Sequence, residues 1–215
     1  MTVATYAYID GFNLYHGAVK GTKLKWLDVL ALCQSLYPNQ PIDLIRYFTA
    51  WVKPLTHDTK ATLRQGMYLR ALRTIPNLHI CTGYFLSKTC VFPQFPFAYL
   101  NPNRPPLTVQ INKMEEKGTD VNLASYLLLD CFENKFDDAL VISNDSDLIF
   151  PIEMVVKKYN RKVHVFNPHR SRSPNQRLIK VATSYTIIDP KILPNCQFPD
   201  PLTDSKGQFT KPPTW

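Results

Sequence analysis

The stretch VISNDSDLIF, residues 141–150, runs from a segment that suits a buried β-strand directly into polar residues. Asp145 and Asp147 lie two residues apart at the point where such a strand would leave the core. Like charges at this spacing repel each other unless a positive charge lies between them. The stretch therefore predicts a strand whose carboxyl end lies at a binding site for a positively charged ligand.

The same arrangement opens the chain. The segment TVATYAYID, residues 2–10, predicts a buried strand that ends in Asp10, and it is followed by Gly11 for a tight turn and Asn13 at the start of a helix. Asp120 lies in the first turn of the amphipathic helix expected over 119–134. Because parallel strands present their carboxyl ends at one edge of a sheet, we expect Asp10 and the acids at 145 and 147 to converge there, with Asp120 close by.

The remaining apolar patterns alternate between the strand period and the helix period. This alternation predicts an α/β fold, a parallel sheet with helices on both faces. Further strands are expected at 41–52, 77–86, 137–143, 161–167 and 184–189, and further helices at 13–20, 25–38, 56–74, 148–159 and 174–182.

Two segments interrupt the alternation. Residues 87–110 are rich in proline and aromatic residues, which excludes a helix and predicts an irregular loop or an edge ribbon, inserted over about 87–112. From Pro190 onward the chain is again rich in proline, and we expect a tail that is extended or disordered on its own, with docking on the domain left open. The predicted division is therefore a domain over 1–189 and a tail over 190–215.

Composition limits the partners. The 215 residues are 45% hydrophobic, as in ordinary globular proteins, and the formal charge of +8 suits a polyanion such as nucleic acid. No apolar run approaches the length of about 18 residues that a membrane span needs, and no secretory signal is recognisable, so we expect no membrane association. The five cysteines form no C-x-x-C pair, which favours free thiols in the cytoplasm over a zinc site.

Each acid on its own has a simpler explanation. Asp120 could stabilise a helix N-terminus, and Asn13, Asp145 and Asp147 could cap the helices that follow them. Gathered at one edge, however, uncompensated acids would cost several kcal/mol in repulsion and desolvation. Mg²⁺ or Mn²⁺ would remove that cost, and such a site can activate a water for attack on phosphorus. Neither a G-x-S-x-G elbow nor a phosphate-binding P-loop is present to indicate another chemistry.

The blocks YIDGFNLYHG (8–17), EEKGTDVNLASYLLLD (115–130), VISNDSDLIFPIEMV (141–155) and RKVHVFNP (161–168) resemble the NYN domain family of PIN-like ribonucleases, which includes LabA-like proteins. The resemblance extends over about residues 4–189. It implies a three-layer, Rossmann-like PIN/NYN fold with a central parallel sheet of about five to six strands, in the order 3-2-1-4-5. It also implies a Mg²⁺- or Mn²⁺-dependent endonuclease that hydrolyses RNA.

By motif position, the resemblance implies that Asp10, Asp120 and Asp145 are metal-site acids, that Asp147 is a further one, and that Asn13 is a polar helper in the catalytic site. The family's usual last block reads Gly-Asp-Gly-Asp. Here it is Asn144-Asp145-Ser146-Asp147, which keeps both acids but not the glycines. The backbone of this turn can therefore differ from the family pattern, although asparagine tolerates unusual φ angles better than most residues.

A nuclease must also hold a polyanion. The candidates for phosphate contact are Arg64, Lys113, Lys117, Arg170, Arg172 and Arg177. A solvated loop explains the arginines after residue 167 equally well, and a solvated helix face is the better explanation for Arg64.

The leading hypothesis is a metal-dependent RNA endonuclease without an organic cofactor, with self-association left open. The alternative is a non-catalytic RNA-binding or assembly module on the same fold, favoured by the altered turn at 144–147 and by the proline-rich tail. A nucleotide-sugar transferase would rest on the D-x-D of Asp145 and Asp147 alone. A haloacid-dehalogenase-type phosphatase lacks the second acid two residues after Asp10.

Overall fold

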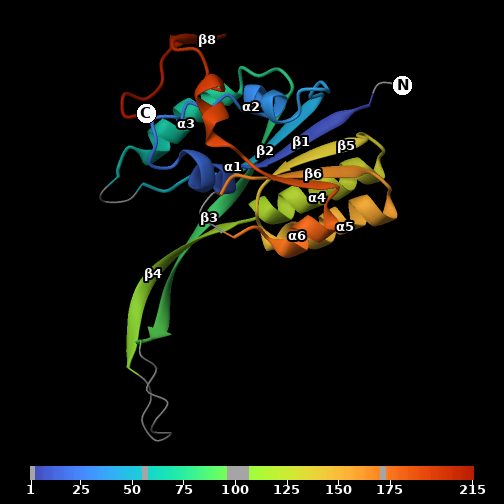
Figure 1. Cartoon of the computed structure of the whole chain (residues 1–215). Coiled ribbons are helices and arrows are strands. Elements are labelled where there is room, and N and C mark those ends of the chain that lie inside the picture. Colours follow the sequence, from blue (N-terminus) through green and yellow to red (C-terminus); the bar gives the residue numbers. More distant parts are fainter. Residues whose placement is uncertain (1–2, 55–57, 96–106, 170–172) are drawn as a thin grey trace, which may run out of the picture.

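A seven-stranded sheet forms the centre of the computed structural model, which describes residues 3–54, 58–95, 107–169 and 173–215 (Figure 1). Its strand order is β4-β3-β2-β1-β5-β6-β7. The strands are β1 (Thr5–Asp10), β2 (Leu44–Ala50), β3 (Leu78–Pro93), β4 (Thr108–Lys117), β5 (Asp138–Ile142), β6 (Lys162–Asn167) and β7 (Ser184–Ile187).

Every neighbouring pair in this sheet is parallel except β3 and β4. The predicted α/β architecture is therefore present, but the strand count and order differ from the prediction of five to six strands in the order 3-2-1-4-5. The insertion supplies β4 as an antiparallel strand outside β3, and residues 184–187 add β7 outside β6. The five inner parallel strands keep the predicted succession of neighbours.

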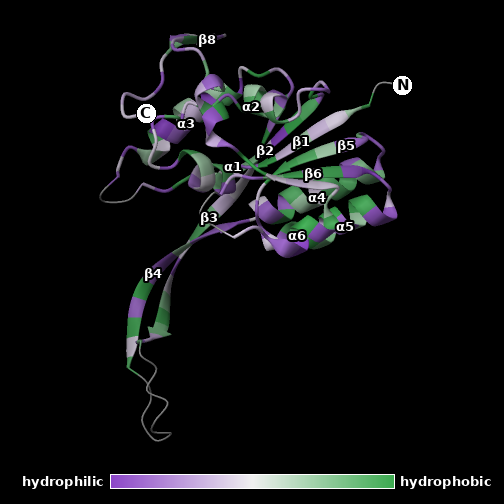
Figure 2. Cartoon of the chain, viewed as in Figure 1, coloured by the Kyte–Doolittle hydropathy of each residue, from purple (hydrophilic) through white to green (hydrophobic). Residues whose placement is uncertain are grey.

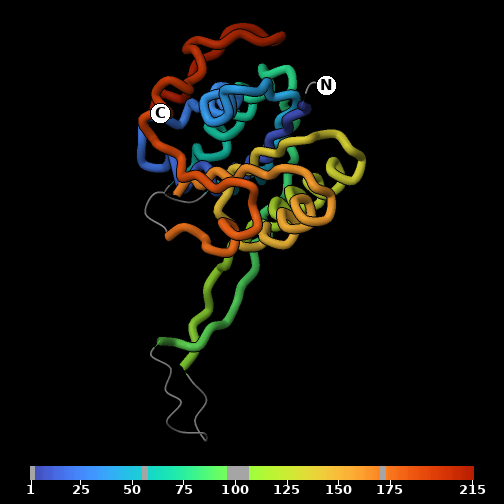
Figure 3. The backbone as a smooth tube through the Cα atoms, turned by 45° about the vertical axis from the view of Figure 1, so that its right-hand side comes forward, coloured from blue at the N-terminus to red at the C-terminus, as the bar shows by residue number. Residues whose placement is uncertain are grey.

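Helices cover both faces of the sheet (Figures 1 and 3). One face carries α1 (Gly11–Leu14) with its π-helical continuation η1 (Tyr15–Val19), α2 (Val29–Leu36) and α3 (Ala61–Leu72). The other carries α4 (Thr119–Phe132), the 3-10 turn η2 (Ser146–Leu148), α5 (Ile149–Glu153), the π-helical turn η3 (Met154–Lys158) and α6 (Gln176–Val181). Among the described residues, no helix is both long and apolar enough to cross a bilayer.

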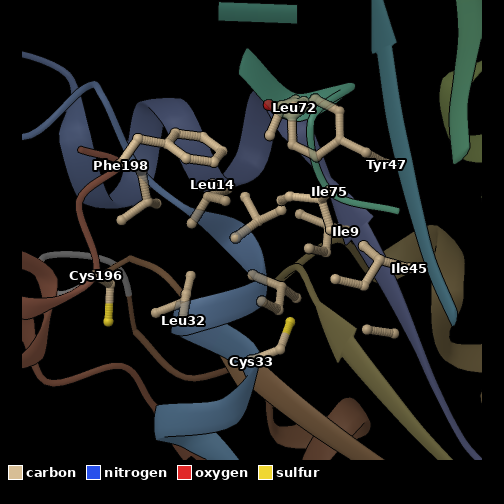
Figure 4. Close-up of a cluster of buried hydrophobic side chains, with 14 of the residues drawn as sticks. Ile9, Leu14, Leu32, Cys33, Ile45, Tyr47, Leu72, Ile75, Cys196 and Phe198 are labelled. Atoms are coloured by element: carbon tan, nitrogen blue, oxygen red, sulfur yellow. The ribbon is translucent and has the colours of Figure 1, made fainter. Parts of the chain in front are cut away.

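The core on the α1–α3 side contains residues from the end of the chain as well as from the sheet. Ile9 of β1 and Ile45 of β2 point toward Leu32 of α2, and Cys196 and Phe198 lie in the same cluster (Figure 4). Burial of this apolar surface is the main term that holds the layer on the sheet.

Residues 190–215, which were expected to be extended or disordered on their own, are ordered against the body of the protein. They form a 3-10 helix, η4 (Pro190–Asn195), and a small hairpin of β8 (Leu202–Asp204) and β9 (Gly207–Phe209). This segment covers Trp26, whose indole nitrogen donates a 3.1 Å hydrogen bond to the carbonyl of Pro199. The proposed domain boundary at residue 189 stays a prediction.

The strands β3 and β4 extend far beyond the body as a two-stranded ribbon (Figures 1 and 3). Their pairing runs from Tyr84 opposite Lys117 to Pro93 opposite Thr108. Hydrophobic and hydrophilic stretches alternate along the ribbon (Figure 2). An irregular loop and an edge ribbon were the two structures predicted for this insertion, and the ribbon is confirmed for the residues that the structure describes. Pro93 lies at the end of the pairing on an edge strand, where proline is tolerated.

Candidate active site at the carboxyl edge of the sheet

Asp10 is the most buried acid at the carboxyl edge. It ends β1, the strand at the centre of the sheet, and only 4% of its surface is exposed. Its Oδ1 accepts a 2.9 Å hydrogen bond from the backbone N–H of Asn13, so that Asp10 caps α1. Burial raises the pKa of Asp10, while the hydrogen bonds from Asn13 and Ser143 act in the opposite direction. The carboxylate is therefore held in one orientation by its neighbours.

Ser143 connects Asp10 to the turn that follows β5. Its hydroxyl donates a 3.1 Å hydrogen bond to Asp10 Oδ2 and accepts one of 3.1 Å from the N–H of Asp145. Asp145 in turn caps η2, because its Oδ1 accepts a 2.9 Å hydrogen bond from the N–H of Asp147. Asp145 is half-buried and Asp147 is exposed. The capping role expected as an alternative is thus present for Asp145, together with a fixed link to Asp10.

Asn13 holds two loops against α1. Its Oδ1 accepts a 3.2 Å hydrogen bond from the N–H of Asn144 and one of 2.9 Å from Nε2 of His169. His169 is buried, and its own N–H donates to Oδ1 of Asn167 at the end of β6. Gly17 permits this close packing, since a Cβ there would lie 2.9 Å from the carbonyl carbon of Pro168. Asn13 therefore ties the ends of β5 and β6 to the helix that follows β1.

Asp120 reaches the same edge from the opposite layer of helices. It lies in the first turn of α4, a helix that begins directly after Gly118, whose φ is 94°. Gly83 of β3 lies against the residues that precede α4. A Cβ on Gly83 would collide with the carbonyl oxygen of Lys117, so β3 needs a glycine at this position. Glu116 accepts a 3.1 Å hydrogen bond from the N–H of Thr119 and adds another carboxylate beside Asp120.

Electrostatics show that these acids share one region. Burial raises the pKa of Asp120 to about 7, and the negative charges of Asp10, Asp145, Glu116 and Asp147 act in the same direction. Four acids predicted from the sequence are therefore brought together from three separate parts of the chain. Their mutual repulsion is the kind that a cation relieves.

This arrangement fits a divalent cation that keeps several of its water ligands. Among the described residues, no three His, Cys, Asp or Glu side chains already form a group that could hold a metal ion. Mg²⁺, however, commonly keeps several waters and takes only one or two carboxylates together with a substrate phosphate. The buried Asp10 beside the half-buried Asp120 and Asp145 suits such a water-rich site.

The predicted basic residues have different surroundings. Lys113 and Lys117 both pair with Glu115 on the ribbon, and Lys117 is also next to the start of α4. Arg64 pairs with Asp58 on the other side of the sheet. Arg170 and Arg172 lie outside the described residues.

Arg177 lies in a helix whose start is joined by hydrogen bonds to the turn after β5. It is exposed in the first turn of α6, which Asn175 caps. The N–H of Asn175 donates to the hydroxyl of Tyr185, which donates a 2.7 Å hydrogen bond to Oδ1 of Asn144. The start of α6 is thus fixed to the turn that carries Asp145, and phosphate contact by the Arg177 side chain stays a prediction.

Sequence reasoning missed Ser143, His169, Glu116 and Tyr185. Ser143 and Glu116 lie inside the quoted motif blocks. Their nearness in sequence to Asp145 and Asp120 could have indicated that they lie beside these acids. His169 directly follows the block RKVHVFNP, just outside the quoted motifs. Nothing in the sequence pairs Tyr185 with Asn144, because that contact depends on how β7 joins the sheet.

Comparison with known proteins gives three findings. Residues 91–189 match the sequence model of the NYN domain. The chain is 29% identical, over an alignment of 240 residues, to 6-hydroxy-3-succinoylpyridine 3-monooxygenase HspA of Pseudomonas putida, with 98% of this chain and 75% of that protein covered. A crystal structure of a protein of unknown function from Vibrio parahaemolyticus superposes with a TM-score of 0.55 at 16% identity, covering 87% of this chain and 94% of the other. The last likeness concerns the fold alone.

Proposed function

Residues 91–189 of this chain belong to the NYN domain family, as the motif blocks in that range predicted, and from that premise we propose that the chain is a divalent-metal-dependent endoribonuclease. The family points to the PIN-like nuclease superfamily, whose members generally use divalent metals. RNA as the substrate, Mg²⁺ or Mn²⁺ as the cofactor and the cytoplasm as the location are parts of this proposal.

One observation carries the proposal. Asp10, Asp120 and Asp145 come from β1, α4 and the turn after β5, yet each lies within the electric field of the others. An arrangement that destabilises the fold in this way is expected at functional sites, where repulsion is kept because a ligand relieves it.

The chain's own residues would orient the reacting groups. Hydrogen bonds from Asn13 and Ser143 fix both oxygens of Asp10, and Ser143 also fixes the turn that carries Asp145. A bound Mg²⁺ or Mn²⁺ would supply positive charge beside the scissile phosphate and activate a water for attack on phosphorus. Lys117 and Arg177 would contact neighbouring phosphates of the RNA.

The test compares cleavage of labelled structured and unstructured RNA in Mn²⁺, in Mg²⁺ and in EDTA. We expect cleavage that requires the metal and that Asp145→Asn abolishes. Glu133→Gln is the matched control, because Glu133 follows the far end of α4 from Asp120. Undiminished cleavage by Asp145→Asn would contradict the proposed site. Tight RNA binding with no turnover in either metal would favour the non-catalytic RNA-binding module instead.

A second candidate function comes from the Pseudomonas putida relative, whose name describes a monooxygenase acting on a substituted hydroxypyridine. The observation that favours it is a match over 98% of this chain. Such a reaction places one atom of dioxygen in the substrate and releases the other as water, with two electrons from a reductant of the nicotinamide class. Substrate-dependent uptake of dioxygen with NADH and a hydroxypyridine would support it, and uptake that is the same without the hydroxypyridine would reject it.

A further inference from the structure

A cavity of about 310 Å³ lies on the α1–α3 side of the sheet, next to the acids but separate from them. Aromatic side chains form part of its walls, among them Phe12 of α1, Tyr47 of β2, Tyr68 of α3 and Trp215. This volume is at the lower end of the range of about 300–1,000 Å³ for small-molecule sites. The cavity therefore suits one compact ring system rather than an extended chain.

The hydroxyl of Tyr47 has no hydrogen-bond partner in the described part of the chain, although the residue is only 5% exposed. Two other polar side chains of the cavity already form hydrogen bonds within the protein. The hydroxyl of Tyr68 donates to the carbonyl of Leu27 at 2.8 Å, and the side-chain amide of Gln65 donates to the carbonyl of Ala50 at 2.8 Å. Tyr47 lines the cavity, so its hydroxyl offers a donor to a ligand there.

Glycine at position 11 keeps the space beside this hydroxyl open. A Cβ built on Gly11 would lie 2.7 Å from Oη of Tyr47 and 2.7 Å from the carbonyl oxygen of Phe48. Burial and the negative charge of Asp10 both raise the pKa of Tyr47. The hydroxyl therefore stays protonated at neutral pH and remains able to donate.

The charge of the cavity is positive. Lys25 and Lys53 line it, and neither forms an ion pair with an acid among the residues described here. Arg64 and Asp58 also line it, but they pair with each other. Two lysines are thus left to receive negative charge on a ligand.

We propose that this cavity binds a planar aromatic anion, with the ring between the aromatic walls, an acceptor atom at the hydroxyl of Tyr47 and the anionic group at Lys25 and Lys53. Aromatic walls favour stacked or edge-to-face rings, and fixed polar groups orient the ligand. The same chemistry belongs to the base and phosphate of a nucleotide and to a free aromatic carboxylate. Because Gly11 and Phe12 directly follow Asp10, a ligand in the cavity would lie beside the acids.

Isothermal titration calorimetry on the full chain tests the proposal with two sets of anions and their neutral counterparts. The first set is the four nucleoside 5′-monophosphates against the nucleosides, and the second is pyridine-3-carboxylate and 4-hydroxybenzoate against the corresponding amides. We expect at least one set to bind, with each anion tighter than its neutral counterpart. Binding of the nucleotides alone assigns the cavity to a strand of nucleic acid, and binding of the carboxylates alone assigns it to a free small molecule.

Tyr47→Phe keeps the ring and removes the hydroxyl, so it should raise the dissociation constant about tenfold, the effect of one hydrogen bond. Tyr37→Phe is the matched control, because the Tyr37 hydroxyl donates to Asp138 at 2.6 Å, away from the cavity. Replacing Lys25 and Lys53 by Gln should remove the preference for anions. The proposal is overturned if no probe binds at millimolar concentration, or if Tyr47→Phe and Trp215→Ala both bind as the wild type does.

The proposed nuclease function can fail independently of the cavity. Asp145→Asn should bind the same probe with an unchanged dissociation constant, since Asp145 does not line the cavity. If cleavage is absent but the probe binds, the cavity stands without the nuclease. If cleavage is present but no probe binds, the nuclease stands without the cavity.

Discussion

Asp120 shows what gathering acids at one edge does to a single residue. Its pKa in the folded protein is about 7, above the usual value of 3.8, because the residue is partly buried among other carboxylates. Between these two pH values the folded state binds more protons than the unfolded state. Stability therefore falls as the pH rises from about 4 to about 7, and the loss is complete above the folded pKa.

Asp120→Asn removes this charge, so we expect it to raise the free energy of unfolding at pH 8 by about 1–2 kcal/mol in EDTA, a figure reduced for partial exposure. At pH 4 the substitution should have little effect, because the wild-type carboxyl is then protonated in the folded state. Urea unfolding at both pH values measures the difference. A gain of equal size at pH 4 and pH 8 would show that repulsion is not its cause.

Ser143 provides a second prediction for a single residue. Its hydroxyl joins Asp10 to the N–H of Asp145, and the side chain is 1% exposed. Ser143→Ala should therefore loosen the turn and lower metal-dependent cleavage about 10–100-fold, as loss of an outer-shell partner does. Thr22→Ala, which removes a hydroxyl bonded to Val19 far from the acids, is the control. Cleavage that falls equally in both variants would speak against a positioning role.

The acids could be predicted from the sequence because their position follows from one rule. Strand ends of a parallel sheet share an edge, so Asp10 and Asp145 converge whatever the side-chain details are. His169 and Tyr185 could not be assigned in this way. Their roles depend on hydrogen bonds between loops that are far apart in the sequence, and no residue pattern encodes these partners.

Among the elements, the contact between α4 and the sheet contains a buried charge. Asp130 is fully buried and accepts two hydrogen bonds from Arg46 of β2, of 2.7 and 2.8 Å, and one of 2.8 Å from the hydroxyl of Tyr8 of β1. Asp130→Ala leaves Arg46 without its partner, so we expect a loss of about 3–5 kcal/mol in the free energy of unfolding. Tyr8→Phe should cost only about 1 kcal/mol. Guanidinium unfolding of both variants measures this, and similar losses would contradict the account.

The ribbon should not contribute to the stability of the body. Of its described residues beyond the pair Ser87 and Met114, none belongs to either hydrophobic core cluster. Replacing residues 88–113 by Asn-Gly would close the ribbon with a favoured two-residue turn. We expect the melting temperature to change by no more than about 2 °C, because a surface change away from the core has a small effect. A drop well beyond this, measured by circular dichroism, would mean that the ribbon packs on the body.

The limits of the elements were harder to predict than their existence. The helix expected from residue 56 begins at Ala61, and the strand expected to end at residue 86 continues to Pro93. Local periodicity shows that an apolar face exists. It does not show that β3 has a partner strand in β4, whose pairing is decided by contacts across the inserted segment.

At the scale of the whole molecule, residues 190–215 are part of the hydrophobic core on the α1–α3 side of the sheet. Trp26 is 2% exposed, and the ring centroids of Phe198, Phe209 and Trp215 lie 5.9, 6.3 and 6.4 Å from that of Trp26. Arg70 of α3 pairs with Asp204 at 2.7 Å and stacks on Phe209. The proline-rich composition of this segment predicted disorder. Composition describes the segment by itself, and it does not describe the surface of the body on which the segment packs.

Phe198→Ala tests whether this packing stabilises the fold. The side chain is 6% exposed, so truncation would leave a cavity beside Trp26, and we expect a loss of about 3–5 kcal/mol in the free energy of unfolding. Phe95→Ala is the matched control, because Phe95 is 86% exposed and should change stability by less than about 0.5 kcal/mol. Urea unfolding followed by tryptophan fluorescence reports both the stability and the surroundings of Trp26. If the two variants lose the same stability, residues 190–215 do not belong to the cooperative core.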